Sequence, residues 1–287
     1  MPSSGKPRQM KKLKSIELKV LNMMKLLVFI LVFSFGIGSC AQKTYIRDDT
    51  TFKVLSYNIH HANPPSVPDK IDLEAIAKVI NESGASLVGL QEVDVHTLRS
   101  GKSSNQAEEL GKMTGMHVYF SKGIDYQGGE YGTAILSKYP ILKAERHELP
   151  NREGLKAEPR TLAVVTVEVE GERIKFANTH LDYTNAENNL LQVNKILDIF
   201  EGEQLPVILV GDFNALPESP SIQLLDQHFT RSCTENCGFT IPQVHPNRTI
   251  DFIMASKEAP FEVTAHEVIN EPYASDHLPV LAAYQMK

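Results

Sequence analysis

The 287-residue sequence has no tryptophan and only three cysteines, Cys40, Cys233 and Cys237. A zinc site is disfavoured because no second cysteine pair accompanies Cys233 and Cys237. These two cysteines lie four residues apart, and the sequence leaves open whether they form a small local disulfide or remain free thiols. Internal repeats and low-complexity linkers are absent from residues 51–287, whose length suits one large α/β domain.

The sequence also lacks a basic cluster once its first 40 residues are set aside. Those residues contain seven of the 29 lysines and arginines and one of the 35 acidic residues, so the remaining chain carries 22 basic and 34 acidic side chains and a formal charge of −12. An acidic body repels phosphate polymers, and the salt-dependent term that dominates nucleic-acid binding is weak for it. This charge disfavours a dedicated nuclease.

No apolar run reaches the roughly 20 residues that a membrane-spanning helix requires. The main run, residues 26–33, follows Lys25 and leads through small residues to Cys40. A basic start, a short apolar core and small residues before a cleavage site are typical of a secretory signal. We therefore favour a signal peptide over a transmembrane helix. Because that signal is complete from Met23 or Met24, the preceding residues are expected to be an extension or to reflect an upstream start.

Residues 37–40 resemble the lipobox of bacterial lipoproteins, in which the cysteine thiol receives a diacylglycerol and becomes the new N-terminus. On this resemblance Cys40 is a lipid anchor, and residues 1–40 are an N-terminal extension plus a lipoprotein signal peptide. Residues 41–50 are expected to be a polar tether, and residues 51–287 the functional domain. The sequence therefore predicts an exported bacterial lipoprotein of the cell envelope, located in the periplasm or at the outer membrane.

Strand and helix patterns alternate through the functional domain. Apolar spacing predicts helices over residues 73–80 and 188–200, and Ser103 with Gln106 is placed as the capping box of a third helix. Strands are predicted at residues 52–56, 86–90, 133–137, 162–169, 173–178, 206–210, 249–254, 261–268 and 280–284. Hairpins mixed with crossovers indicate sheets packed under helices.

Polar side chains gather where the predicted strands end. They are Asn58, Glu92, His180, Asp212, Asn214, Asp276 and His277. Any one of them alone is most simply a cap or a turn residue. Asp251 differs, because it lies inside the predicted strand 249–254, and a buried carboxylate needs a partner or a metal. Together these residues indicate a site that a rigid sheet holds in position.

At these residues the sequence resembles the endonuclease/exonuclease/phosphatase superfamily, which contains DNase I-like nucleases, neutral sphingomyelinases and inositol polyphosphate 5-phosphatases. The matching segments, in family order, are residues 56–59 (SYNI), 90–93 (LQEV), 178–182 (NTHLD), 211–214 (GDFN), 249–253 (TIDFI) and 275–279 (SDHLP). The resemblance spans about residues 52–286. It implies a four-layer α/β/β/α sandwich of two mixed sheets flanked by helices, with the active site at one edge of the sheets.

The resemblance and the chemistry of the side chains predict a metal-dependent site. Asn58, Glu92 and Asp276 offer only oxygen ligands, the preference of a hard cation such as Mg²⁺ or Mn²⁺. Such a cation polarises a phosphoryl oxygen and stabilises charge on the leaving group.

Five further residues are expected to act on the substrate. Asp212 is suited to orient or deprotonate the attacking water, with Asn214 beside it to hold water or phosphate. His277 and Asp251 are predicted to form a carboxylate–imidazole pair, in which the acid fixes the tautomer and favours the charged ring. His180 is expected to hydrogen-bond the pentacoordinate phosphoryl group. The sequence leaves open whether Asp212 or His277 is the general base.

Three more positions are ambiguous. Arg160 is either an arginine that pairs with two phosphate oxygens, as in family members that place one just before a strand, or a surface arginine paired with Glu158. Tyr131 is either a substrate-loop hydroxyl or a plain turn residue, and the turn is favoured. His60 and His61 follow the first predicted strand, and because adjacent side chains rarely share one site, at most one is expected to face the pocket.

The sequence therefore predicts an exported, lipid-anchored, Mg²⁺-dependent phosphoesterase that hydrolyses a phosphodiester or phosphomonoester by in-line attack of water. A lipid headgroup or a small phosphoester fits the anchor, and the protein is expected to work as a monomer. A DNase I-like extracellular nuclease is the alternative among enzymes, although it would need a basic or aromatic surface. A non-catalytic binding lipoprotein is the alternative from another class, although no catalytic position is vacant.

Overall fold

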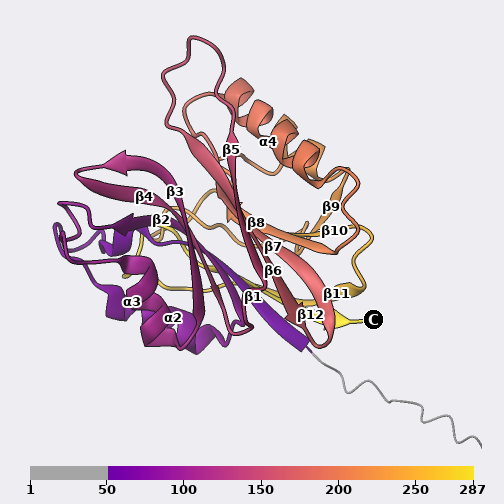
Figure 1. Cartoon of the computed structure of the whole chain (residues 1–287), viewed down its shortest axis with the longest axis horizontal. Helices are drawn as coiled ribbons and strands as arrows, with labels where there is room; N and C mark the ends of the chain where they lie inside the picture. Colours follow the sequence, from indigo (N-terminus) through magenta and orange to yellow (C-terminus); the bar gives the residue numbers. More distant parts are fainter. Residues whose placement is uncertain (1–50) are drawn as a thin grey trace, which may run out of the picture. The chain divides into compact units, whose positions relative to one another are not determined.

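The computed structural model describes residues 51–287, so Cys40, the signal peptide and the tether lie outside the described residues. Within the described part, two six-stranded sheets pack face to face, and helices cover their outer faces (Figure 1). This arrangement confirms the four-layer α/β/β/α sandwich predicted from the sequence. In residues 51–287 no helix is long and apolar enough to cross a membrane.

The first sheet carries the strands at both ends of the domain. Its strands, in spatial order, are β11 (Phe261–Val268), β12 (Val280–Met286), β1 (Thr51–Asn58), β2 (Leu87–Val95), β4 (Gly129–Ser137) and β3 (His117–Tyr126). β1 pairs antiparallel with β12 and parallel with β2, so the sheet is mixed. Helices α2 (Leu73–Ser83) and α3 (Gln106–Thr114) pack their apolar faces against its outer side.

The second sheet has the same mixed character. Its strands, in spatial order, are β5 (Lys143–Leu149), β6 (Arg160–Val169), β7 (Glu172–His180), β8 (Val207–Asp212), β10 (Asp251–Ser256) and β9 (Phe229–Arg231). β7 pairs parallel with β8, while the other neighbours are antiparallel. Helices α4 (Ala186–Phe200) and α5 (Pro220–Leu225) cover its outer face.

The central strands are buried on both faces, which explains their continuous apolar sequence. In β8, Ile208 and Val210 pack into the core between the sheets, whereas Val207 and Leu209 pack under the helices. All six residues of β8 are buried. Strands covered on both sides are apolar at every position rather than at alternate positions. The helices thus leave only the strand ends free for polar chemistry.

The two sheets pack closely together at Gly89 on β2. A Cβ atom at this position would overlap the side chain of Val210 and lie 2.9 Å from the side-chain oxygen of Asn178. Asn178, fully buried on β7, donates to the carbonyl oxygens of Leu90 and Ala134 at 2.8 and 2.9 Å. The buried amide therefore joins the second sheet to β2 and β4 of the first, at a point where only glycine fits.

The predicted capping box at Ser103 and Gln106 is wrong. Helix α3 begins at Gln106, and its N-cap is Asn105, whose side chain accepts from the Glu108 N–H. Glu109 Oε1 accepts from the Asn105 N–H at 3.0 Å and completes the cap. Asparagine is at least as good an N-cap as serine, so the true cap lies two residues later in the chain.

Candidate active site

Strands β7, β8 and β10 are neighbours in the second sheet, and three polar side chains lie at their ends. His180 ends β7, Asp212 ends β8, and Asp251 opens β10. In the ladder His180 pairs with Asp212, and Asp212 pairs with Asp251. Paired residues on neighbouring strands point to the same face. The sequence predicted a strand over residues 249–254 that contains Asp251. Asp251 is indeed a strand residue, but β10 starts at Asp251 itself, two residues later than predicted.

The first sheet contributes Asn58 and Glu92 from neighbouring strands. Asn58 ends β1, and Glu92 lies in a bulge of β2, where the pairing with β4 shifts between Leu90 and Val93. The φ of Glu92 is 59°, a left-handed backbone that bulges and functional sites tolerate. Asn58 Nδ2 donates to Glu92 Oε1 and to Asp212 Oδ2, both at 3.0 Å. One amide thus joins the two sheets at the site.

The loop before β12 supplies His277, whose ring lies between two carboxylates. Its Nδ1 donates to Asp251 Oδ2 at 2.9 Å, and its Nε2 lies 3.7 Å from Asp212 Oδ2. His180 Nε2 lies 3.5 Å from the same Asp212 oxygen. Asp212 is therefore flanked by two imidazoles that are almost 100 residues apart in the sequence.

The two imidazoles differ in charge. Burial lowers the pKa of His180 well below its ordinary value, and the charges of Arg160 and His277 lower it further. Burial alone would also lower the pKa of His277, but Asp251 and Asp212 outweigh it and raise that pKa to about 10. Burial, and then the charge of Asp251, raise the pKa of Asp212. At neutral pH the site thus combines a neutral ring, an imidazolium and a carboxylate that accepts a proton readily.

A cavity of about 570 Å³ opens onto these groups. Its polar lining comprises Glu92, Tyr131, Glu158, Arg160, His180, Asp212, Asn214, Arg248 and His277. Asn214 follows β8 with a φ of 48°; its backbone N–H donates to Asp212 Oδ1 at 2.9 Å, and its Nδ2 donates to the Leu181 carbonyl. The structure therefore brings Glu92, Arg160 and all the predicted catalytic residues except Asp251 to the wall of one cavity, and Asp251 lies directly behind His277.

For Arg160 and Tyr131 the structure differs from the alternatives that the sequence offered. Arg160 pairs with Glu158 at 2.9 Å, yet its side chain is only 5% exposed, and its Nε has no hydrogen-bond partner. It is thus both an ion-pair partner and a buried donor at the cavity, not a surface residue. Tyr131 lies within β4 and lines the cavity, so the favoured assignment to a turn is wrong.

Five predicted or candidate residues are not part of the lining of this cavity, namely Asn58 and Asp251, described above, and His60, His61 and Asp276. His60 and His61 lie in a short turn, η1 (His60–Ala62), with φ values of 46° and 44°. Neither histidine lines the cavity, which agrees with the expectation that at most one of them would face it. Asp276 is half-buried, and its carboxylate lies 3.4 Å from the Ser275 hydroxyl. Its assignment as a metal ligand stays a prediction.

The donor set fits a hard divalent cation on the Glu92 side of the cavity. Glu92, Glu158 and Asp212 bring three carboxylates to one cavity, and within residues 51–287 Glu92 forms no ion pair with lysine or arginine. Glu158 is paired with Arg160 and Asp212 lies beside His277, so Glu92 is the carboxylate of this group left available to a cation. Asp212, Asp251 and His277 also lie close together. Because an imidazolium has no free lone pair, we assign this second group to proton handling rather than to metal binding.

A model described as the Endonuclease/Exonuclease/phosphatase family matches residues 55–277. The chain belongs to the Endonuclease/Exonuclease/phosphatase family. Members of this family hydrolyse phosphoester bonds and generally depend on a divalent metal. The cavity just described, with its carboxylates, imidazoles and arginine, occupies the edge of the sheets where the family resemblance placed the active site.

Relatives of known sequence or structure agree with this family assignment. The Escherichia coli (strain K12) protein "Uncharacterized protein YbhP" is 25% identical over 246 residues, which cover 81% of this chain and 95% of the relative. An endonuclease/exonuclease/phosphatase from Beutenbergia cavernae DSM 12333 has a TM-score of 0.68 at 24% identity, covering 82% of this chain and 72% of that one. The mannosyl-6-phosphatase Bt3783 of Bacteroides thetaiotaomicron VPI-5482 has a TM-score of 0.66 at 21% identity, covering 81% and 99%.

Sequence reasoning missed Thr240, which holds the carboxylate behind His277. Its hydroxyl donates to Asp251 Oδ2 at 2.5 Å, and its side chain is fully buried. Its backbone N–H donates to the Arg248 carbonyl, and its carbonyl accepts from the Leu278 N–H. Thr240 therefore fixes Asp251 and joins the segment that carries Arg248 to the loop that carries His277. The only sequence signal for it was indirect, namely that a buried Asp251 needs more than one donor.

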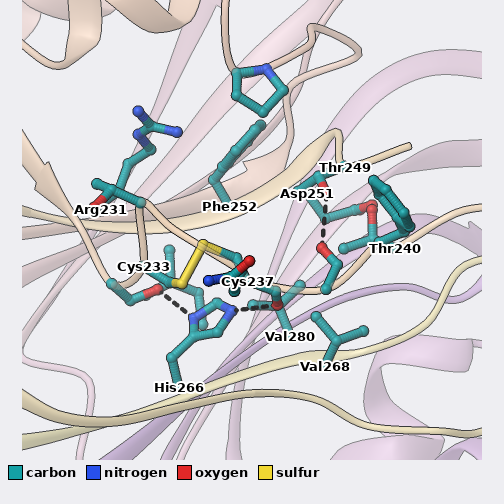
Figure 2. A pocket seen from close by; sticks show the side chains of 17 residues that line it. Arg231, Cys233, Cys237, Thr240, Thr249, Asp251, Phe252, His266, Val268 and Val280 are labelled. Atoms are coloured by element: carbon teal, nitrogen blue, oxygen red, sulfur yellow. Dashed lines mark hydrogen bonds between the residues drawn. A yellow bond between two sulfur atoms is a disulfide. The ribbon is translucent and has the colours of Figure 1, made fainter. Parts of the chain in front are cut away.

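The loop between β9 and β10 that carries Thr240 also contains a disulfide between Cys233 and Cys237, one of the two alternatives left open by the sequence. The ring of His266 on β11 bonds the Ser232 hydroxyl at 2.9 Å and the Cys237 carbonyl at 3.2 Å, which ties the loop to the first sheet (Figure 2). A second cavity of about 500 Å³ lies between this loop and Asp251. The disulfide thus lies behind the candidate site and does not line the 570 Å³ cavity.

Proposed function

We propose that this chain is an exported, lipid-anchored phosphoesterase that uses Mg²⁺ or Mn²⁺ and hydrolyses a phosphodiester or phosphomonoester by in-line attack of water. The observation that carries the proposal is the position of Asp212 between the neutral ring of His180 and the imidazolium of His277. Glu92 and Arg160 line the same cavity. A proton acceptor, hydrogen-bond donors and a cationic group thus converge on the space for one phosphoryl group.

Asp212 is the better proton acceptor of the two candidates. In its imidazolium form His277 already carries a proton on each ring nitrogen and cannot take another. The carboxylate of Asp212 takes a proton from water as the water oxygen bonds to phosphorus, and the bond from phosphorus to the leaving oxygen breaks on the opposite side. His277 Nε2 then serves as a charge-assisted donor to a phosphoryl oxygen.

The remaining polar groups hold the phosphoryl oxygens and the cation. The unpartnered Nε of Arg160 and the neutral ring of His180 are donors at the cavity wall. Glu92, with the predicted ligands Asn58 and Asp276, would hold the divalent cation. When bound, that cation polarises a phosphoryl oxygen and neutralises charge on the leaving oxygen.

The dimensions of the cavity favour a small phosphoester or a lipid headgroup over a polymer. About 570 Å³ suits a small molecule. The formal charge of −12 on residues 41–287 opposes long polyanions. One solved structure of this fold is a mannosyl-6-phosphatase. At 21% identity that likeness supports the fold alone, so the proposal rests on the site.

The first test is hydrolysis of bis-p-nitrophenyl phosphate, inositol phosphates, sphingomyelin and plasmid DNA by the purified protein. We expect turnover of at least one small or lipid phosphoester in Mg²⁺ or Mn²⁺. EDTA should abolish it, and added Mg²⁺ should restore it, because the carboxylates cannot compensate for the missing positive charge. His277→Ala should lower the rate by about 10²-fold or more, as removal of a donor to developing charge does.

Each other outcome points to a named alternative. Metal-dependent cleavage confined to DNA, and lost in His277→Ala, would establish the nuclease instead. Turnover that survives EDTA would contradict the metal role of Glu92. Silence on all four substrates would support a binding lipoprotein that retains only the fold.

The lipid anchor is tested separately, in bacterial cells that express the full chain. We expect Cys40→Ser to move the protein from the membrane fraction to the soluble fraction, because a diacylglycerol on the thiol is the proposed attachment. Labelling with radioactive palmitate should disappear in the same variant. Unchanged labelling or fractionation would contradict the anchor without affecting the catalytic proposal.

A further inference from the structure

The catalytic cavity extends beyond the groups that act on the phosphoryl group. Part of its wall is apolar or aromatic and consists of Tyr183, Leu216, Ile241 and Ile250. Tyr183 is 71% exposed and Leu216 39% exposed, so both are available to a ligand. One more charged side chain completes this part of the wall, that of Arg248. This second part of the cavity has room for the organic portion of a substrate.

Arg248 is unusual among the arginines of the described chain. Residues 51–287 contain seven arginines, and six of them form ion pairs with carboxylates, namely Arg99, Arg146, Arg152, Arg160, Arg173 and Arg231. Within the same residues, the Arg248 side chain has no hydrogen bond, ion pair or ring contact. In a chain with a large excess of acidic residues, an arginine without a partner at the wall of an active-site cavity is available for an anion.

The backbone of Arg248 is fixed even though its side chain is free. Its N–H donates to the Ile241 carbonyl at 3.1 Å, and its own carbonyl accepts from the Thr240 N–H at 2.8 Å. Thr240 in turn is bonded to Asp251 and to the loop of His277. The backbone of Arg248 is thus anchored to the same support as the catalytic pair, and its exposed side chain extends from this anchored backbone at the cavity wall.

The order of strands separates the two arginines of the cavity. Arg160 opens β6, and Arg248 precedes the first residue of β10 by three positions, with β7 and β8 between the two strands. Three strand spacings, roughly 14 Å, separate β6 from β10. His180 and Asp212 end the two strands between them. A phosphoryl group held by Arg160 and His180 therefore leaves Arg248 free for a different anionic group.

We propose that Arg248 binds a second anionic group, a phosphate or a carboxylate, on the organic part of the substrate. The preferred substrate is then a small phosphoester with one further anion on its leaving group, and this inference rests on the proposed function. A polynucleotide fits less well, because only Arg248 and Arg160 supply permanent positive charge to the cavity wall. The planar guanidinium can pair with two oxygens of either anion.

The direct test measures binding and does not need turnover. Isothermal titration calorimetry in Mg²⁺ compares alkyl phosphonates with α,ω-alkane bisphosphonates and ω-phosphonocarboxylates of four and eight carbons, none of which can be hydrolysed at phosphorus. The wild-type protein should bind at least one two-anion probe tenfold or more tightly than its matched alkyl phosphonate. Arg248→Gln should reduce the ratio of the two-anion affinity to the one-anion affinity below threefold. Arg248→Lys should retain part of this ratio. A preference for the bisphosphonate identifies phosphate as the second group, and a preference for the phosphonocarboxylate identifies a carboxylate.

Arg173→Gln is the matched control, because Arg173 is exposed near the other end of β7 and its ion pair with Glu168 is long, at 3.9 Å. The Arg173→Gln variant should keep the wild-type ratio of two-anion to one-anion affinity. Equal binding of one-anion and two-anion probes to the wild type, or an unchanged ratio in Arg248→Gln, would overturn the inference. Thermal unfolding of each variant shows that a lost ratio does not come from a lost fold.

A parallel assay separates this inference from the proposed function. It compares kcat/KM for hexyl phosphate and hexane-1,6-diol bisphosphate in the wild type and in Arg248→Gln. Hydrolysis of both at equal rates, with no discrimination in binding, would keep the phosphoesterase and overturn the role of Arg248. Discrimination in binding without hydrolysis of any phosphoester would keep the role of Arg248 and overturn the phosphoesterase.

Discussion

Asp212→Asn is expected to lower kcat for the best small phosphoester by about 10³-fold, within the range of about 10²–10⁴ that a positioned proton acceptor contributes. The carboxylate is buried, lies 3.5 Å from His180 and 3.7 Å from His277, and has a raised pKa. An amide has nearly the same shape but cannot accept the proton of the attacking water. KM should change far less than kcat, because the donors that hold the phosphoryl group remain.

The matched control for this change is Asp198→Asn, an exposed aspartate on α4. It should leave kcat within about twofold of the wild type, since surface substitutions away from special features have small effects. Circular dichroism and thermal unfolding establish that both variants fold. If Asp212→Asn retains a tenth or more of the wild-type kcat, Asp212 is not the proton acceptor, and the choice between it and His277 must be reversed.

The sequence predicted this site because its residues lie at strand ends next to apolar runs. His180 and Asp212 end the parallel strands β7 and β8, and parallel neighbours finish at the same edge of a sheet. Asn58 reaches Asp212 because β1 ends at the same edge of the sandwich. Motif order and strand position were therefore sufficient to bring these residues together, without any knowledge of distances.

The strands that sequence reasoning missed share one property, which is their position at sheet edges. β3, β5 and β9 each have a neighbour on only one side. β5 is polar at most positions, with only Leu149 fully buried, so it lacks the apolar pattern on which the prediction relied. The central strands, covered by helices on one face and by the other sheet on the other, were predicted within a few residues. Burial is therefore most of what the sequence pattern reported, although the largely exposed edge strand β11 was predicted with its exact bounds.

Two details of the site depend on backbone geometry that no side-chain pattern reveals. Glu92 and Asn214 both have positive φ values, one in a bulge and one in the turn after β8. Thr240 reaches Asp251 across a loop that has no periodicity. Such positions are set by tertiary contacts, and functional sites are where local rules are most often broken.

Substitution of Gly89, where the two sheets pack closely together, has the largest expected effect on the stability of the fold. Gly89→Ala should lower the free energy of unfolding by at least about 3 kcal/mol, since overpacking costs about 1–3 kcal/mol and each of the two broken buried hydrogen bonds a further 1–3 kcal/mol. The added methyl group would overlap Val210 and push aside Asn178. Asn178 could then no longer satisfy the buried carbonyl groups of Leu90 and Ala134.

Urea unfolding followed by circular dichroism measures this change, with Gly154→Ala as the comparison. A Cβ at Gly154 meets open space, but φ there is 77°, so an alanine should cost only about 1–2 kcal/mol of left-handed backbone strain. Because Gly89 precedes Glu92 by three residues on β2, a wider gap between the sheets would also separate Asn58 from Asp212 and lower activity in the folded fraction. A Gly89→Ala protein within 1 kcal/mol of the wild type, with normal activity, would show that the sheets can move apart here and that this close contact does not position the site.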